Sequence, residues 1–187
     1  MHRDKGKLLM IFFIFSETFF FIALIIAYVY YRNFSDATDT VAKHLDAFRA
    51  GIFTLFLIAS SFTLLFSKKA LLKKKYTNFK LWMALTILFG VVFMLGQVTE
   101  YIGLYQKQIT LEKDIFGSSF FTLTGFHGLH VILGIIALGI LFAMSFGKLK
   151  KVAFSGINGV DIYWHFVDIV WLFVFYFVKK KTAYDIN

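Results

Sequence analysis

The chain has 187 residues, of which 59% are hydrophobic, 20% aromatic and 17% charged, and its formal net charge is +9. Soluble domains have about 45–50% apolar and about 25% charged residues, so this chain has too few polar residues to cover a water-facing surface. The absence of Cys excludes disulfides, thiolate metal sites and a Cys nucleophile. The sequence therefore predicts one integral-membrane unit over residues 1–187, with most of its surface facing lipid.

Five apolar runs are long enough to cross the hydrocarbon core of a bilayer, which takes about 20 residues of α-helix. Lipid offers no hydrogen-bond partners to the backbone, so the expected spanning form is helical. The predicted fold is an all-α bundle of five transmembrane helices, at residues 8–31, 50–67, 81–105, 119–146 and 162–178. The segments between these runs are too short to fold into a further domain, so we expect them to be connections.

The distribution of Lys and Arg predicts the orientation, because short cytoplasmic loops are enriched in both. The N-terminal segment, residues 68–80 and residues 147–161 hold more than half of the 20 Lys and Arg residues. This pattern predicts an N-terminus inside and a C-terminus outside, whereas the Lys residues at 179–181 argue for the opposite orientation. The basic loops either bind anionic headgroups or only fix the topology. Nucleic-acid binding is not expected, because the charge flanks membrane spans and no soluble binding module is present.

Two Glu residues stand inside the apolar runs, where ionisable groups are costly and often functional. Glu17 lies near the middle of the first run, on a helix face that is rich in Phe. It is either a proton-exchanging or lipid-contacting group beside a partner, or a protonated acid bonded to a neighbouring helix. Glu100 lies near the outer end of the third run, one turn after Gln97, and a structural hydrogen bond to another helix is the expected role.

Two His residues share one face of the fourth run. His127 and His130 are three residues apart, and Gly134 lies between them in angle, where it would clear space for a ring or a neighbouring helix. Such a pair either ligates a metal or makes hydrogen bonds between helices. A single H-x-x-H motif does not decide between these roles.

The fifth run carries the motif YWHFVD near its inner end. His165 and Asp168 are three residues apart, so we expect a direct charged hydrogen bond that fixes the helix position. Trp164 and Tyr163 fit an aromatic belt at the membrane interface. Glu17, the two His residues of the fourth run, His165 and Asp168 are expected at different depths. A shared metal centre is therefore disfavoured, and no catalytic residue is predicted.

The sequence resembles subunit III of the haem-copper terminal oxidases in three segments. They are GKLLMIFFIFSETFFFIALIIAYVYYRN, FGSSFFTLTGFHGLHVILG after Glu100-Tyr101, and YWHFVDIVWLFVF. Their order and spacing also match that family, and the similarity covers nearly the whole chain. The chain is similar to the five-helix bacterial form, which lacks the first two helices of the seven-helix form.

The resemblance implies an accessory, non-catalytic subunit of a proton-pumping cytochrome c oxidase in a bacterial cytoplasmic membrane. It implies no cofactor in this chain apart from structural phospholipids, with the haems and copper held by partner subunits. Subunit I is the implied main contact, with subunit II, a small subunit IV and a respiratory supercomplex as further partners. Support of proton uptake and of stability during turnover is the implied function.

By the same resemblance, Glu17 is the buried carboxyl close to bound lipid. Glu100, His127 and His130 are polar pairings between helices, and Trp164, His165 and Asp168 form the inner-end motif.

The chain departs from some members after the fourth helix, where Gly147 and Val152 replace Arg and His. The candidates for lipid headgroup contacts are instead Lys148, Lys150 and Lys151.

Related alternatives for the function are subunit III of a quinol oxidase and an accessory protein of nitric oxide reductase. A stand-alone membrane metalloenzyme is the alternative from another class.

Overall fold

The computed structural model describes residues 2–34, 47–106, 115–146 and 150–179, and these residues form five α-helices and no strand. In chain order the helices are α1 (His2–Phe34), α3 (Ala47–Leu72), α4 (Tyr76–Gln106), α5 (Ile115–Met144) and α6 (Lys150–Lys179). Each contains a continuous segment of at least 24 residues that is long and apolar enough to cross a membrane. The prediction of an all-α fold with five membrane-spanning helices is confirmed.

The helices extend beyond the apolar runs from which they were predicted. The expected connection at 68–80 shrinks to a turn at residues 73–75, because α3 continues to Leu72 and α4 begins at Tyr76. The largest error is in α6, which begins at Lys150 instead of residue 162. Polar residues in its first three turns obscure the helix in a hydropathy pattern, although the backbone continues in one helix.

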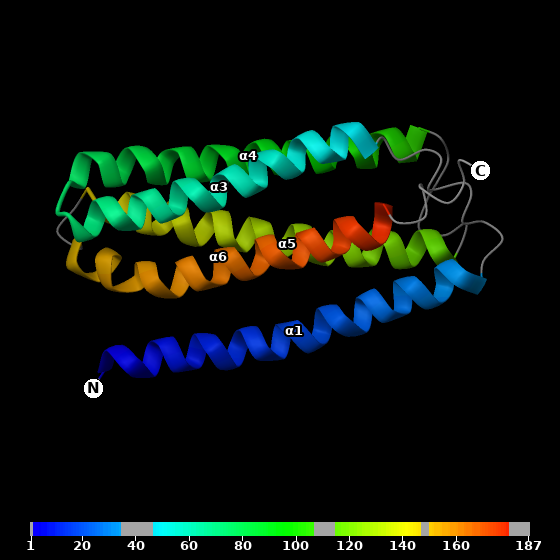
Figure 1. Cartoon of the computed structure of the whole chain (residues 1–187), viewed down its shortest axis with the longest axis horizontal. Coiled ribbons are helices and arrows are strands. Elements are labelled where there is room, and N and C mark those ends of the chain that lie inside the picture. The colour runs from blue at the N-terminus through cyan, green and yellow to red at the C-terminus, as the bar shows by residue number, and fades with distance from the viewer. Residues whose placement is uncertain (1, 35–46, 107–114, 147–149, 180–187) are drawn as a thin grey trace.

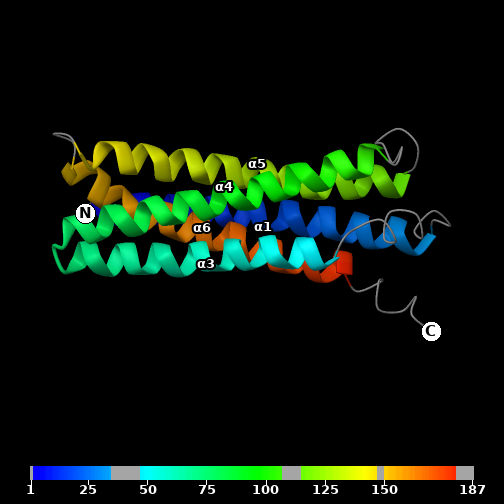
Figure 2. The same ribbon diagram turned by 90° about the horizontal axis from the view of Figure 1, so that it is seen from above.

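The helices lie side by side in three layers (Figures 1 and 2). The antiparallel pair α3 and α4 forms one layer, α5 and α6 form the middle layer, and α1 packs on the far side against α5 and α6. Half of the residues in the most apolar window of α6 are buried, compared with 6% for α1. The sequence therefore places its most polar spanning helix in the centre and its least polar one at the periphery.

The turn between α3 and α4 is closed by a Schellman motif. The amide of Lys75 donates to the carbonyl of Ala70 at 2.9 Å, and the amide of Lys74 donates to that of Leu71 at 2.9 Å. Lys74 has a φ of 57°, the left-handed conformation that this motif requires and that Gly usually supplies. This turn, the start of α1 and the start of α6 lie at one end of the bundle (Figure 1), which we call the basic end. Its basic residues on α3, α4 and their turn are Lys68, Lys69, Lys73, Lys74, Lys75 and Lys80.

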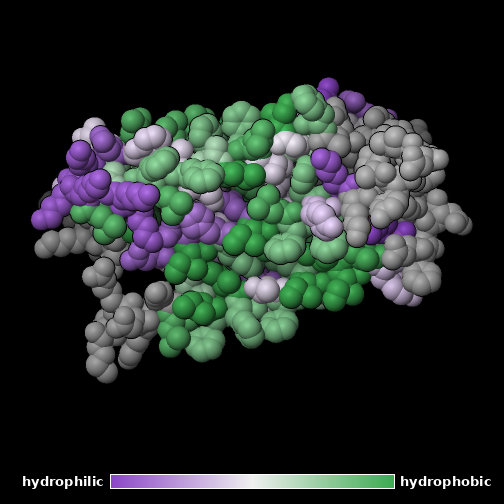
Figure 3. Space-filling model, in the orientation of Figure 1, coloured by the Kyte–Doolittle hydropathy of each residue, from purple (hydrophilic) through white to green (hydrophobic). Residues whose placement is uncertain are grey.

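The surface along the helices is mostly apolar. Large hydrophobic side chains such as Leu9, Phe12 and Leu55 are exposed, and the space-filling view shows a broad hydrophobic face (Figure 3). In water such a surface would be unfavourable, whereas in a bilayer it is the required one. The packed core between the helices contains Leu57, Met83, Phe93, Leu138 and Val174.

Candidate functional site

Glu17 of α1 and His130 of α5 form a direct contact inside the bundle. The Oε2 atom of Glu17 lies 3.1 Å from Nε2 of His130, and Nδ1 of His130 lies 2.7 Å from the carbonyl oxygen of Phe126. That carbonyl only accepts, so Nδ1 carries the hydrogen and Nε2 shares one proton with the Glu17 carboxyl. The expectation that these polar residues do not converge was therefore wrong for this pair.

A third helix also bonds to His130, through Tyr163 of α6. Its hydroxyl donates to the carbonyl oxygen of His130 at 3.0 Å, and its side chain is buried. The prediction that Tyr163 and Trp164 form an interfacial belt is therefore wrong. Both rings lie between helices, because each finds a hydrogen-bond acceptor there.

His127 lies in a different environment from His130. Its ring is fully buried and stacks on Trp171 at a centroid distance of 4.8 Å, with Phe93 and Phe21 at its edges. Neither ring nitrogen has a hydrogen-bond partner among the described residues. The two His residues thus lie in different environments: His127 packs among aromatic rings, whereas His130 is hydrogen-bonded. Nowhere in the described ranges do three His, Asp or Glu side chains gather as a metal-binding group.

Trp164 occupies a slot that two glycines leave open. A Cβ atom on Gly90 would lie 2.9 Å from this ring, and one on Gly134 would lie 2.7 Å from it. The indole N–H donates to Oγ of Ser60 at 3.0 Å. Gly134 clears space for a ring, as the sequence predicted, and Trp164 thereby touches α3, α4 and α5 at once.

Polar side chains of α3 and α6 form a second cluster, closer to the basic end. Oγ of Ser61 lies 2.9 Å from Nδ1 of His165 and donates a hydrogen bond to Oδ2 of Asp168. Asp161 accepts from Nζ of Lys68 at 2.6 Å, and its other oxygen lies 3.5 Å from Nε2 of His165. The expected direct bond between His165 and Asp168 was therefore wrong, because Ser61 stands between them.

The sequence analysis missed three members of this cluster, namely Ser61, Lys68 and Asp161. Asp161 precedes His165 by four residues and so shares its helix face, a signal that was hidden by the assignment of 147–161 to a connection. Ser61 stands in the polar pair Ser60-Ser61 of an apolar run, which was the available sign that α3 has an inward face there.

The polar bonds between α4 and α5 come from Gln97 and Tyr101. Nε2 of Gln97 donates to the carbonyl of Thr124 at 2.8 Å, and the Tyr101 hydroxyl lies 2.7 Å from Oγ1 of Thr124. Glu100 is half-buried and lines the same pocket as Gln97 and Tyr101, so its role as an interhelical bond stays a prediction. Lys148 and the side chains of Lys150 and Lys151 lie outside the described part of the chain.

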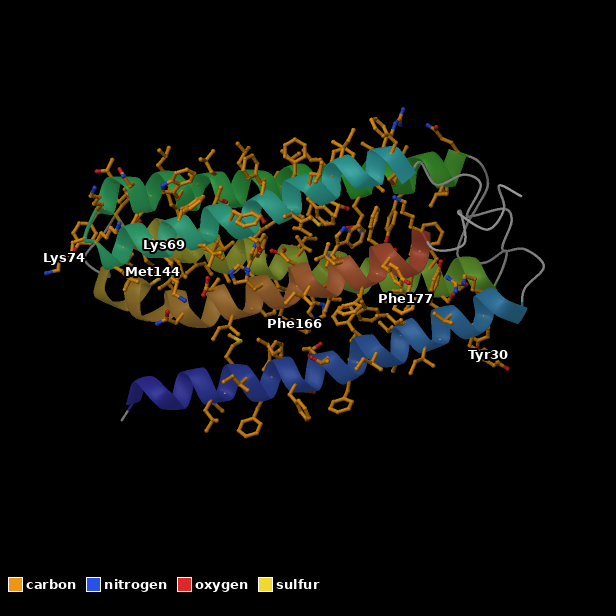
Figure 4. The ribbon with its side chains drawn as sticks, in the orientation of Figure 1. Tyr30, Lys69, Lys74, Met144, Phe166 and Phe177 are labelled. Atoms are coloured by element: carbon orange, nitrogen blue, oxygen red, sulfur yellow. The ribbon has the colours of Figure 1, made fainter. Side chains whose placement is uncertain are left out.

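An apolar groove runs between α1 and α6. Its walls include Ile22, Ile25 and Ile169, together with Phe166 and Phe177, the two α6 residues labelled in Figure 4. At the end far from the basic end, Nη1 of Arg32 donates to the carbonyl oxygen of Phe177 at 2.7 Å and holds the two helices together.

The comparison with known proteins identifies the family. Residues 3–181 match the family model described as cytochrome c oxidase subunit III. The chain belongs to this family. The match covers all five helices in the described residues, and the resemblance noted in the sequence is confirmed.

Individual subunit III relatives cover most of the chain. A cytochrome c oxidase subunit 3 from Thermostichus vulcanus is 34% identical over 98% of this chain and 90% of the relative. The protein of that name from Synechocystis sp. is 31% identical over 95% of this chain and 76% of the relative. A third protein of that name, from Corynebacterium diphtheriae, is 37% identical over 74% of this chain and 69% of the relative. Together with the five spanning helices, these matches identify the chain as a multi-pass membrane protein of the subunit III family.

Proposed function

We propose that this chain is the accessory, non-catalytic subunit of a proton-pumping cytochrome c oxidase in a bacterial cytoplasmic membrane. The family match over residues 3–181 is the observation that carries the proposal. The oxidase subunit with the haems and copper is the proposed main partner, and the N-terminus lies on the cytoplasmic side. The Lys residues at the basic end favour this orientation.

Purification in mild detergent tests this assignment. A tag on the chain should retain a haem-containing oxidase with one copy of the catalytic subunit, and the haem spectrum and subunit bands report it. A purified chain that carries no haem-containing partner would contradict the proposal. Stoichiometric metal bound to the isolated chain would favour the metalloenzyme alternative instead.

We also propose that the groove between α1 and α6 holds a phospholipid acyl chain. Its walls are apolar, as an acyl chain requires, and Thr18 is the polar residue that lines it. The Thr18 hydroxyl donates to the carbonyl oxygen of Ile14 at 2.7 Å, so it is not an unpaired donor in the wall of the groove. A site of this kind would keep lipid close to Glu17, which lies one residue before Thr18 on α1.

Two substitutions on α6 test the lipid site. Ile169 lines the groove and Leu172 does not, although both side chains are exposed, by 53% and 44%. Ile169→Trp should fill the groove and lower the amount of phospholipid that co-purifies, as measured by mass spectrometry. Leu172→Trp is the matched control and should retain wild-type lipid. Equal lipid in both variants would refute the site.

A further inference from the structure

The α3 and α6 cluster is a continuous chain of polar side chains. Lys68 contacts one oxygen of Asp161, the other oxygen of Asp161 faces Nε2 of His165, and Nδ1 of His165 contacts Ser61. Ser61 in turn contacts Asp168. Every inner member thus faces two neighbours, and Asp161 and His165 use a different atom for each. The 3.5 Å contact between Asp161 and His165 is an ion-pair distance at which no hydrogen bond is formed, whereas the other contacts are hydrogen bonds. In the space-filling view a hydrophilic band runs from the basic end into the apolar face (Figure 3).

The chain leads from the end of the bundle to the middle of a membrane span. Asp161 and Asp168 are seven residues apart on α6, which corresponds to about 10 Å along the helix. Asp168 stands near the centre of the span Gly156–Lys179 and is buried. The Lys68 side chain at the other terminus is 31% exposed and lies four residues before the end of α3. One terminus is therefore accessible and the other is enclosed.

The hydrogen positions in this chain follow from its geometry. Ser61 has one hydroxyl hydrogen, which it donates to Asp168. The contact of Ser61 with His165 therefore requires the hydrogen on Nδ1 of His165. The bare Nε2 then faces the Oδ1 atom of Asp161 at 3.5 Å, and this contact becomes attractive when one proton lies between them.

The cluster has one more negative than positive charge, so the uptake of one proton would neutralise it. The groups that face one another are Lys68 from α3 and Asp161, His165 and Asp168 from α6. Two carboxylates oppose one ammonium, and an uncompensated charge within the membrane span is costly. A proton at the contact between Asp161 and His165, or on Asp168, neutralises the cluster.

We infer that Lys68, Asp161, His165, Ser61 and Asp168 form a proton-transfer chain that loads one proton from the basic end onto Asp168. Lys68, the exposed terminus, passes one proton to Asp161 and takes one back from water, and Asp161 passes its proton to Nε2 of His165. His165 releases its Nδ1 proton to Ser61, and Ser61 passes its hydroxyl proton to Asp168. The net change is one proton gained by Asp168, while His165 ends as the other tautomer. Asp161 and Ser61 are unchanged.

This inference rests on the proposed function for its direction, since the basic end is the cytoplasmic side only in the proposed orientation. The simpler alternative is that the cluster only holds α3 against α6. The two readings differ at Ser61, because loss of one hydroxyl interrupts a proton chain but removes little packing between the helices.

The test is infrared difference spectroscopy of the detergent-purified complex with 13C-labelled aspartate, after a jump in pH. The carboxyl band that disappears in Asp168→Asn belongs to Asp168. In the wild type this band should respond to the jump, and in Ser61→Ala the response should be lost. Ser61→Thr keeps a hydroxyl and should restore it. His165→Gln provides a second interruption if Ser61→Ala does not assemble, and the same loss is expected.

The outcomes separate this inference from the proposed function. A wild-type response in Ser61→Ala or His165→Gln would overturn the proton chain, as would the absence of any carboxyl band from Asp168. Either result leaves the oxidase assignment intact if the complex still contains haem. A preparation without haem whose Asp168 band still depends on Ser61 would support the chain and contradict the oxidase assignment.

Discussion

The indole ring of Trp164 fills the space above Gly134 so closely that a Cβ atom there would lie 2.7 Å from Cε3. The two residues belong to α6 and α5, the pair of helices at the centre of the bundle. The ring cannot move away easily, because Gly90 of α4 bounds it on another side and its N–H is held by Ser60 of α3. Four helices thus share one contact point.

Gly134→Ala should destabilise the protein by about 1–3 kcal/mol, the usual effect of overpacking a filled core. Thermal unfolding of the complex in detergent measures this effect. Gly139→Ala on the same helix is the control, because a Cβ there meets no atom within 4 Å. This control should be neutral or slightly stabilising, since Ala is the better helix former. Equal stability of the two variants would show that the slot is not tight.

Lys68→Ala should destabilise the protein by about 1–3 kcal/mol, because it leaves a buried oxygen of Asp161 without its donor. Lys69→Ala removes an equal charge from the adjacent, exposed position and should change stability by about 0.5 kcal/mol or less. Chemical or thermal unfolding of both variants checks the difference. If both behave alike, the contact between Lys68 and Asp161 does not stabilise the fold.

Glu17→Ala should accelerate the loss of oxidase activity during prolonged turnover, if Glu17 helps to keep lipid in the proposed site between α1 and α6. The substitution also leaves Nε2 of His130 without its partner. Ser16→Ala is the control, because Ser16 is the exposed neighbour on α1. Oxygen consumption over many turnovers measures the inactivation rate. A wild-type rate in Glu17→Ala would count against a role of this carboxyl in turnover.

Arg32→Met should loosen the end of α1, because the guanidinium bond to the carbonyl of Phe177 joins α1 to α6 there. Hydrogen exchange should become faster in the last turns of both helices and stay unchanged near Trp164. Lys179→Met removes a neighbouring positive charge that lies over the Phe175 ring and is the control. Unchanged exchange in Arg32→Met would mean that packing alone holds α1 in place.

Asp168→Asn should weaken the retention of this subunit by the oxidase, if the cluster of α3 and α6 also fixes the shape that the partner recognises. The change keeps an acceptor for the Ser61 hydroxyl but removes the charge that faces His165. The fraction of complexes that keep the subunit after washing in detergent measures this. A fully assembled and equally stable complex would restrict the role of Asp168 to proton exchange.

The membrane character of this chain follows from its sequence alone. Runs of about 20 apolar residues and the absence of Pro give the five spanning helices without any tertiary information. The three segments around Glu17, His127 and YWHFVD also identified the family, since motifs of this kind are local in the chain. The start of α6 at Lys150 escaped the same method, because a helix whose early turns are polar has no hydropathy signal.

The partners of the polar residues were decided only by the tertiary structure. Glu17 and His130 are separated by 113 residues, and Ser61 and Asp168 by 107. Helical periodicity gives the face on which a residue lies, but not the rotation of one helix against the next or their relative height. These two quantities come from side-chain packing, such as that of Trp164 against Gly90 and Gly134. They made Ser61, rather than a direct contact, the link between His165 and Asp168.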